Sequence, residues 1–139
     1  MKYYSTIVVG LALVVVLAGC SAGGAFTAGN VTDVQLQRNN FTIIAQNVSG
    51  EAEAGYLIGG TFTMGMATNT FALVRVSGTG MLYKEALEDL WKNFEAAHGP
   101  VGQRKIALIN VRYDADALNL GIYTQPKIMI RADVVEFTE

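Results

Sequence analysis

A helical stripe of apolar residues between Leu82 and His98 is the clearest pattern along the chain. Its members recur at spacings of four, three, four and three, and two further residues widen the stripe: Tyr83, Leu87, Leu90, Phe94 and Ala97, with Ala86 and Trp91. Charged side chains occupy the other faces. Gly99-Pro100 follows directly and is typical of a helix end. The pattern predicts one amphipathic helix that buries its apolar side against a core.

Strand-like patterns lie on both sides of this helix, as alternating or short apolar runs rich in β-branched and aromatic residues. They predict strands at residues 41–48, 51–58, 71–76, 106–113, 117–123 and 127–137. In the last run, apolar and charged residues fall on opposite faces: Ile128, Ile130, Ala132 and Val134 against Lys127, Arg131 and Asp133. We therefore expect an α+β fold, a twisted and mostly antiparallel sheet with one amphipathic helix packed on one face.

Residues with turn chemistry mark the expected connections. Asp114–Asp116 and Thr124–Pro126 have the composition of turns. Ser49-Gly50 fits either a tight hairpin or a bulge in one long bent strand. Glycines interrupt residues 59–80, so the conformation of Thr61–Ser77 stays open between a hairpin, an interface and a loop.

The N-terminal residues have the layout of an export signal. A short basic start with Lys2 precedes the apolar run Ile7–Leu17, which is about half of the roughly 20 residues that a membrane-spanning helix needs. The run ends in Leu17-Ala18-Gly19-Cys20, the lipoprotein motif in which the thiol is diacylated and the chain is cut before the cysteine. A membrane anchor or an ordinary secretory signal are the alternatives, but the latter leaves the chain's single cysteine without a role.

This motif sets the expected organisation of the chain. We expect a signal peptide at residues 1–19, a lipidated Cys20 with a flexible tether over residues 20–39, and a single α+β domain at 40–139. Residues 21–30 are small and polar, which is typical of a tether. Ser21 stands where a retention signal would have aspartate, which favours the outer membrane, facing the periplasm, in a host with two membranes.

Composition limits the chemistry that the chain can support. Removal of the first 19 of 139 residues leaves 120, and the loss of Lys2 leaves 9 basic against 12 acidic residues, a net charge of about −3. This balance gives no electrostatic footprint for nucleic acid. One histidine and one cysteine leave little material for a transition-metal site or a disulfide, and we expect no cofactor.

Three short stretches resemble functional motifs without completing them. Ser77–Gly80 lacks the remaining residues of a phosphate-binding loop. Asp114 and Asp116 are too few for a calcium loop and are better explained by turn chemistry. Glu51 and Glu53 alternate with Ala52 and Ala54, which predicts a solvated acidic face and a side of small residues that a helix can approach closely.

The order of these segments resembles a family of small uncharacterised bacterial lipoproteins. The resemblance rests on pieces spread over residues 40–137: Asn40-Phe41, Val48–Ala52, Tyr56, the helix near Ala86, Ala107–Val111, Ile122-Tyr123 and Ala132–Phe137. The order of strands and helix is similar to that of the TRL-like lipoproteins and, more distantly, to that of dodecin-like and heavy-metal-binding pentameric domains. Thr61–Ser77 is longer than the family's usual glycine link. The resemblance implies a strand-helix-strand-strand fold and an envelope address, and it supplies no catalytic residues.

Taken together, these patterns predict a lipid-anchored, non-enzymatic envelope protein. Its partners would be the membrane, through acyl chains on Cys20, and either further copies of itself or another envelope protein. A small-ligand or metal-binding module is the alternative, with a pocket between subunits or beneath residues 59–80. An enzyme is the weakest hypothesis, because His98 is the sole histidine and no nucleophile has an evident partner.

Overall fold

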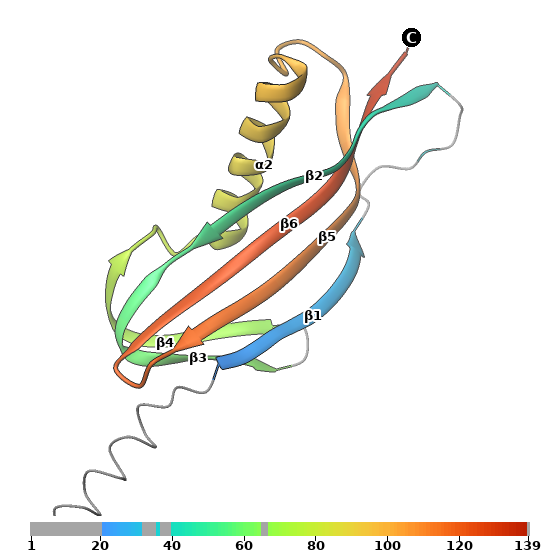
Figure 1. Cartoon of the computed structure of the whole chain (residues 1–139). Helices are drawn as coiled ribbons and strands as arrows, with labels where there is room; N and C mark the ends of the chain where they lie inside the picture. The colour runs from blue at the N-terminus through green and yellow to red at the C-terminus, as the bar shows by residue number, and fades with distance from the viewer. Residues whose placement is uncertain (1–20, 32–35, 37–39, 65–66, 139) are drawn as a thin grey trace, which may run out of the picture.

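The computed structural model describes residues 21–31, 36, 40–64 and 67–138. In these ranges the chain forms six strands and one helix (Figure 1): β1 (Ser21–Val31), β2 (Phe41–Glu53), β3 (Gly55–Met64), β4 (Ala67–Ser77), α2 (Leu82–His98), β5 (Ile106–Asn119) and β6 (Tyr123–Phe137). The strands belong to one sheet in the order β1-β5-β6-β3-β4, and β2 also pairs with β6. All of these pairings are antiparallel.

Strand β6 is the centre of the sheet. It pairs with β5 along one side, from Asn119↔Thr124 to Ile106↔Glu136. Along the other side it pairs first with β3 at Thr124 and then with β2 from Lys127 to Phe137. β2 and β3 therefore follow one edge of β6 in succession, and β3 turns away to form a hairpin with β4.

The expected α+β class is wrong, because the described chain is mainly β. β5 continues through Asp114–Asp116, and β6 begins at Tyr123 and includes Thr124–Pro126, two stretches that we expected to be turns. Each of these stretches pairs with residues of the other strand, for example Asp116↔Lys127 and Leu118↔Gln125. The continuous ladder thus overrides local turn propensity. The connection is the shorter Leu120–Ile122, where Gly121 has a φ of 74°.

Pro126 lies inside β6 at a place where a missing N–H group is tolerated. A residue of an antiparallel strand directs its N–H and C=O groups toward the same neighbour. The Pro126 carbonyl accepts a hydrogen bond from the Ala54 N–H at 3.1 Å. Ala54 lies between β2, which ends at Glu53, and β3, which begins at Gly55. The proline therefore faces the break between these strands.

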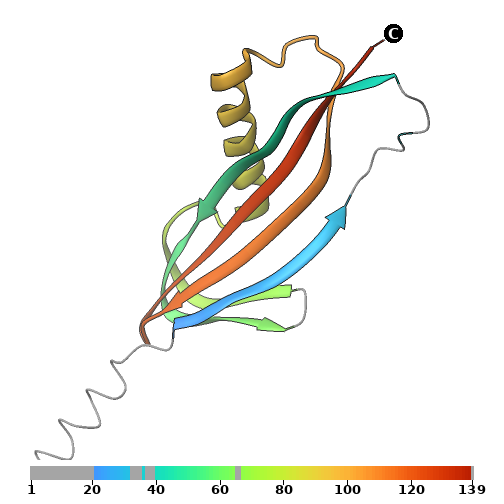
Figure 2. The same cartoon turned by 45° about the vertical axis from the view of Figure 1, so that its right-hand side comes forward.

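Ser49-Gly50 is part of a continuous strand, since β2 pairs regularly with β6 from Val48 to Glu53. The glycine serves the approach of the helix. A Cβ atom added to Gly50 would overlap both the Ala86 carbonyl oxygen and the Leu90 backbone nitrogen. Ala52, two residues further, is buried in the core cluster with Ala86 and Leu90. Small residues on β2 thus let α2 pack closely on one face of the sheet (Figure 2).

The helix prediction is confirmed at both ends, since α2 spans Leu82–His98. Its buried residues are Ala86, Leu90 and Phe94. The predicted stripe is wrong at its margins, because Tyr83 and Ala97 are exposed whereas Leu82 packs partly on the core. Figure 2 shows the helix crossing β2 at an angle.

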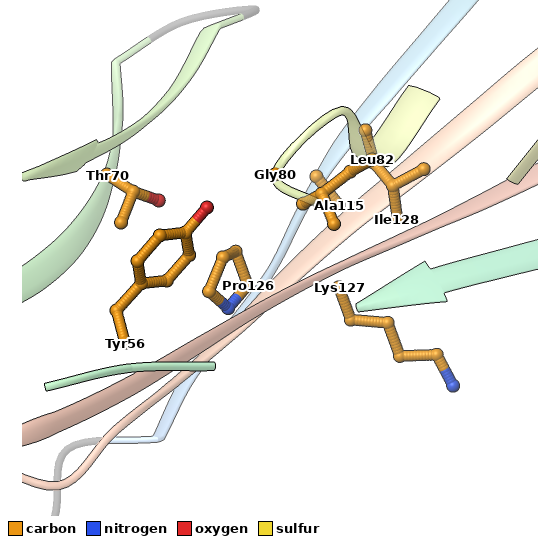
Figure 3. A pocket seen from close by; sticks show the side chains of 8 residues that line it. All are labelled: Tyr56, Thr70, Gly80, Leu82, Ala115, Pro126, Lys127 and Ile128. Atoms are coloured by element: carbon orange, nitrogen blue, oxygen red, sulfur yellow. The ribbon is translucent and has the colours of Figure 1, made fainter. Parts of the chain in front are cut away.

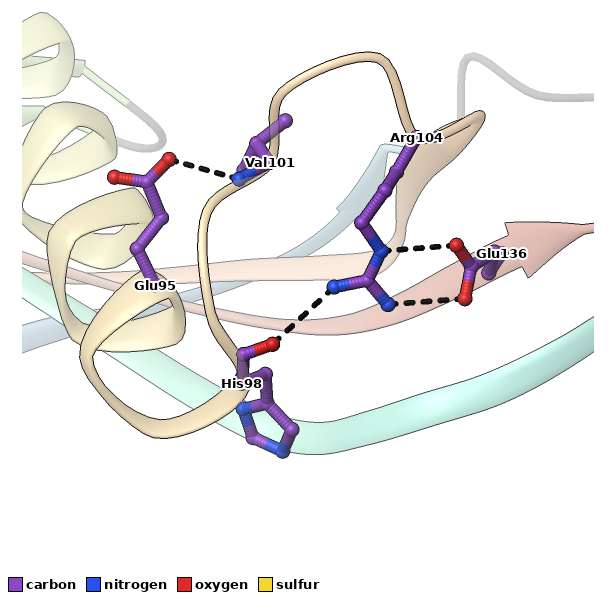
Figure 4. A network of polar contacts seen from close by, with 5 residues as sticks. All are labelled: Glu95, His98, Val101, Arg104 and Glu136. Carbon is purple, nitrogen blue, oxygen red and sulfur yellow. Dashed lines mark hydrogen bonds and ion pairs between the residues drawn. The ribbon is translucent and has the colours of Figure 1, made fainter.

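Arg104 joins the end of the helix to the end of β6 (Figure 4). Its guanidinium donates two hydrogen bonds of 2.9 Å to the Glu136 carboxylate and one of 3.4 Å to the His98 carbonyl. It also lies 5.8 Å above the centre of the Phe94 ring, against which His98 stacks. The side-chain hydrogen bond from Arg104 lowers the pKa of Glu136. His98 is an exposed residue of the last turn of the helix.

Two irregular points flank β6 at Asp133. The β2 ladder shifts between Ala45 and Val48, and the β5 ladder shifts between Ile109 and Arg112. Asn47 and Asn110 lie at these shifts with φ values of 53° and 52°, a conformation that asparagine tolerates well. Asp133 accepts a 2.9 Å hydrogen bond from the Asn47 N–H and another from the Asn110 side-chain amide. One carboxylate therefore holds both bulges.

Residues 21–31 differ from the expected tether, because they form β1 and pair with β5 from Ser21↔Leu118 to Val31↔Val111. Pairing with a free sheet edge uses backbone groups and does not require apolar side chains. A segment rich in glycine and alanine can therefore be ordered by its neighbour although its composition is that of a linker. Cys20 and residues 32–35 and 37–39 of the expected tether lie outside the described residues.

Candidate functional site

Large apolar side chains are exposed mainly at one end of the sheet. Of fourteen such residues in the described chain, ten belong to the β3–β4 hairpin, to the end of β5 or to the β5–β6 connection. We call this set the apolar end: Leu57, Ile58, Phe62, Phe71, Leu73, Val74, Val76, Leu118, Leu120 and Ile122. The two parts adjoin, because the Ile58 N–H donates a 2.7 Å hydrogen bond to the Ile122 carbonyl.

Both faces of the β3–β4 hairpin contribute to the apolar end. Phe71 and Leu73 alternate with Val74 and Val76 along β4, so the two pairs point to opposite faces. Phe71 is 73% exposed and Leu73 70%, while Val74 and Val76 on the other face are 48% and 52% exposed. The described chain thus covers neither face. A large exposed apolar surface marks contact with a protein or a membrane.

The apolar end is also almost free of charge. Residues 55–77 contain one charged side chain, Arg75, and residues 117–126 contain none. The Arg75 guanidinium donates a hydrogen bond to the Thr79 carbonyl, near the start of the helix. A surface that must remain in water normally carries interspersed charges, so this end of the molecule suits a partner that excludes water.

A partly buried polar cluster fixes the hairpin to the main sheet. The Asn119 side chain accepts a hydrogen bond from the Thr61 N–H and donates one to the Thr61 carbonyl, both at 3.0 Å, so it replaces a strand partner. The Thr124 hydroxyl lies 2.6 Å from Asn119 Oδ1 and 2.8 Å from Thr61 Oγ1. Because Asn119 Oδ1 can only accept, Thr124 donates its single hydrogen there. The Thr70 hydroxyl completes the cluster, 3.0 Å from Thr61.

A cavity of about 330 Å³ lies between the hairpin, the start of α2 and the β5–β6 pair (Figure 3). Its lining includes Tyr56, Thr70, Leu82, Pro126 and Lys127. Two of these polar groups already have partners, since Thr70 bonds to Thr61 and the Lys127 ammonium lies 2.5 Å from Glu51. The cavity occupies the place where we considered a ligand pocket, but it offers few polar groups for recognising a ligand.

The acidic residues singled out in the sequence form a charged face of the sheet. Glu53 and Asp116, on the two neighbouring strands, both pair in register with Lys127. A hydrogen bond from Lys127 to Glu51 raises the pKa of Lys127, and Glu53 and Asp116 add to the effect. Glu51 and Glu53 are exposed, as expected for a solvated face. Asp114 and Asp116 lie in a strand and not in the expected turn.

The remaining expectations concern the lipid anchor and metal binding. Cys20, the expected lipidation site, lies outside the described residues. Among the residues that are described, no group of three or more histidine, cysteine, aspartate and glutamate side chains is arranged to hold a metal ion. The same ranges contain no helix long and apolar enough to span a membrane.

Comparison with known proteins identifies a family. The chain matches, over residues 1–139, a family of unknown function (DUF6567). The protein belongs to this family. No curated protein and no solved structure matches the chain. The family carries no established role, so a role has to be argued from the site itself.

Sequence reasoning missed the apolar end and the polar cluster. The usable signal was the scarcity of charge between Gly55 and Ser77, combined with Phe62, Phe71 and Leu73 in strand-like alternation. The cluster left no such signal, because its contacts join residues 58 and 63 positions apart.

Proposed function

We propose that this protein is a lipoprotein of the bacterial cell envelope, anchored by acyl chains on Cys20, and that it acts through surface contacts and not by catalysis. The observation that carries the proposal is the apolar end, a nearly uncharged surface on which ten large side chains are exposed. Such a surface supports a binding or structural role. The resemblance to TRL-like lipoproteins and the Leu17–Cys20 motif support the anchor.

The anchor is compatible with stable membrane attachment. A single acyl chain gives marginal, reversible binding, whereas two or more chains hold a protein firmly, at about 0.8 kcal/mol for each buried methylene. In a host with two membranes, Ser21 after the cysteine favours the outer membrane, with the domain facing the periplasm. The proposal includes contacts with further copies of the protein or with another envelope protein. It does not include ligand binding in the cavity beside Tyr56, because Thr70 and Lys127 in its lining are already paired.

Comparison of the wild type with Cys20→Ser tests the anchor. We expect the wild type to carry acyl mass and to stay in the membrane fraction, and the variant to remain unprocessed and unacylated. Intact-mass spectrometry and membrane fractionation measure both properties. Ser49→Ala, which alters a serine in β2 far from the motif, is the control and should leave processing unchanged. A wild type without acyl mass, or a Cys20→Ser variant processed in the same way as the wild type, would refute the proposal.

A further inference from the structure

The apolar end lies where the chain emerges from its proposed lipid anchor. β1 begins at Ser21, which pairs with Leu118 of the apolar end. Figures 1 and 2 both show β1 starting at the end of the sheet that carries the β3–β4 hairpin and the β5–β6 connection, with the C-terminus at the opposite end. Cys20 is bonded to Ser21, and successive Cα atoms are about 3.8 Å apart. An acylated Cys20 would therefore have almost no spacer between lipid and sheet.

From this placement we infer that the apolar end rests on the lipid bilayer that holds the acyl chains, an inference that rests on the proposed function. With so short a connection, acyl chains inserted in the bilayer bring the β3–β4 hairpin and the β5–β6 connection to the membrane surface. These are the segments on which the described chain exposes most of its large apolar side chains. The position of the anchor and the position of the apolar surface thus point to the same partner.

The distribution of charge fits a lipid surface. The three segments that meet at this end, residues 21–31, 55–77 and 117–126, contain one of the chain's 22 charged residues, 10 basic and 12 acidic. Moving a charged side chain from water into an apolar medium is costly unless it is paired. Charged residues border these segments at Glu53, Asp116 and Lys127. Lys127 offsets the acidic groups there, since it bonds to Glu51 and also interacts with Glu53 and Asp116.

The hairpin geometry limits the depth of insertion. β4 pairs with β3 alone among the described strands, so its outer edge presents backbone N–H and C=O groups without a strand partner. Such groups cannot be left in the hydrocarbon core, where nothing satisfies them. Headgroups and interfacial water can satisfy them. The apolar end therefore lies at the level of the headgroups and the upper acyl chains, with apolar side chains such as Phe62 and Phe71 in contact with lipid.

A lipid-quenching experiment on the acylated full chain tests this inference. Since Cys20 is the chain's single cysteine and is acylated in the mature protein, an introduced cysteine is the sole free thiol. Phe71→Cys and Ile122→Cys place a polarity-sensitive fluorophore on the hairpin and on the β5–β6 connection. Ile43→Cys is the matched control, because Ile43 is an exposed apolar residue of β2 outside the apolar end. Each protein is reconstituted into vesicles whose lipids carry a nitroxide quencher.

We expect blue-shifted emission and quenching by nitroxide lipids at positions 71 and 122, and neither effect at position 43. Intact mass of the same samples reports acylation. Acylated, vesicle-bound protein whose probes at 71 and 122 remain unquenched would overturn the inference and leave the proposed anchor standing. Unmodified Cys20 would instead refute the anchor itself. Shielding of position 71 that rises with the protein-to-lipid ratio, without quenching, would show that a second copy covers this surface and would also overturn the inference.

Discussion

At the scale of single residues, the charge of Asp133 and the geometry of the neighbouring strands are linked. Burial raises the pKa of its carboxyl group, but the hydrogen bonds from Asn110 and from the Asn47 N–H outweigh burial, and the net pKa is lowered. Arg112, which donates a 3.0 Å hydrogen bond to the Asn47 side chain, contributes its positive charge. The ionised form of Asp133 therefore stabilises the two bulges beside β6.

This arrangement predicts a pH-dependent contribution to stability. Because the pKa is lower in the folded than in the unfolded state, Asp133 stabilises the fold above its unfolded pKa of about 3.9, and this contribution is lost as the pH falls through the folded pKa. We expect Asp133→Asn to lower the free energy of unfolding at pH 7 and to differ less from the wild type near pH 3. Urea denaturation at both pH values measures the difference.

The control for Asp133 is a carboxylate at the surface. Glu88→Gln alters an exposed pair with Lys84, whose charged atoms are 3.7 Å apart, and should change the free energy of unfolding by less than about 0.5 kcal/mol at either pH. A pH-independent effect of Asp133→Asn would show that the hydrogen bonds, and not the charge, hold the bulges.

Gly50 is the second residue whose role depends on local geometry. Gly50→Ala would place a methyl group on top of backbone atoms of α2, so the helix must shift away from β2. Overpacking of this kind costs about 1–3 kcal/mol. Gly60→Ala is the matched control, because nothing lies within 4 Å of its added Cβ atom. Thermal or urea unfolding should separate the two variants, and equal stability would contradict the close approach of the helix.

At the scale of elements, the β3–β4 hairpin depends on Asn119 for its attachment. Asn119→Ala removes the partners of the Thr61 N–H and C=O groups and the acceptor of the Thr124 hydroxyl. Loss of partners for buried polar groups costs about 1–3 kcal/mol. We expect a loss of stability in this range and faster amide hydrogen exchange along residues 56–62 and 70–76.

Asn93→Ala is the matched control for this prediction. Asn93 donates a 2.9 Å hydrogen bond to the Ser49 carbonyl from the exposed side of the helix, away from the hairpin. Its replacement should leave hairpin exchange unchanged. If Asn119→Ala behaves in the same way, the side-chain ladder is not what attaches the hairpin.

The elements also show how far the sequence could be interpreted. The helix was predicted to the residue because its signals, the apolar period and Gly99-Pro100, are local. The alternation from Ile128 to Val134 was predicted for the same reason, and Ile130, Ala132 and Val134 are buried. The fold class was wrong because pairing between β5 and β6 extends both strands through residues with turn composition, and such pairing is not encoded locally.

The candidate site was harder to predict than the fold. The hairpin lies beyond the main sheet, and both of its faces are therefore exposed, with Phe71 and Leu73 on one face and Val74 on the other. Alternation in the sequence alone cannot show which face of a strand is covered. Ser49-Gly50 has the composition of a turn, and only the position of the helix shows that the glycine serves close packing.

At the scale of the whole molecule, the fold separates two environments. One end carries the start of β1, the hairpin and the apolar side chains. The charged pairs Arg104–Glu136 and Glu51–Lys127 lie elsewhere, along the sheet and at the end of the helix. The two ends of the molecule therefore differ in character. A lipid anchor on Cys20 would orient the molecule with its apolar end toward the membrane.

The length of β6 gives this orientation a physical extent. A strand of 15 residues, at about 3.3 Å per residue, is about 50 Å long. When the apolar end rests on lipid, the opposite end, where Arg104 joins the helix to β6, can stand up to this distance above the bilayer. The sheet then acts as a rigid spacer that presents the helix end and the last residues of the chain to molecules well beyond the headgroups.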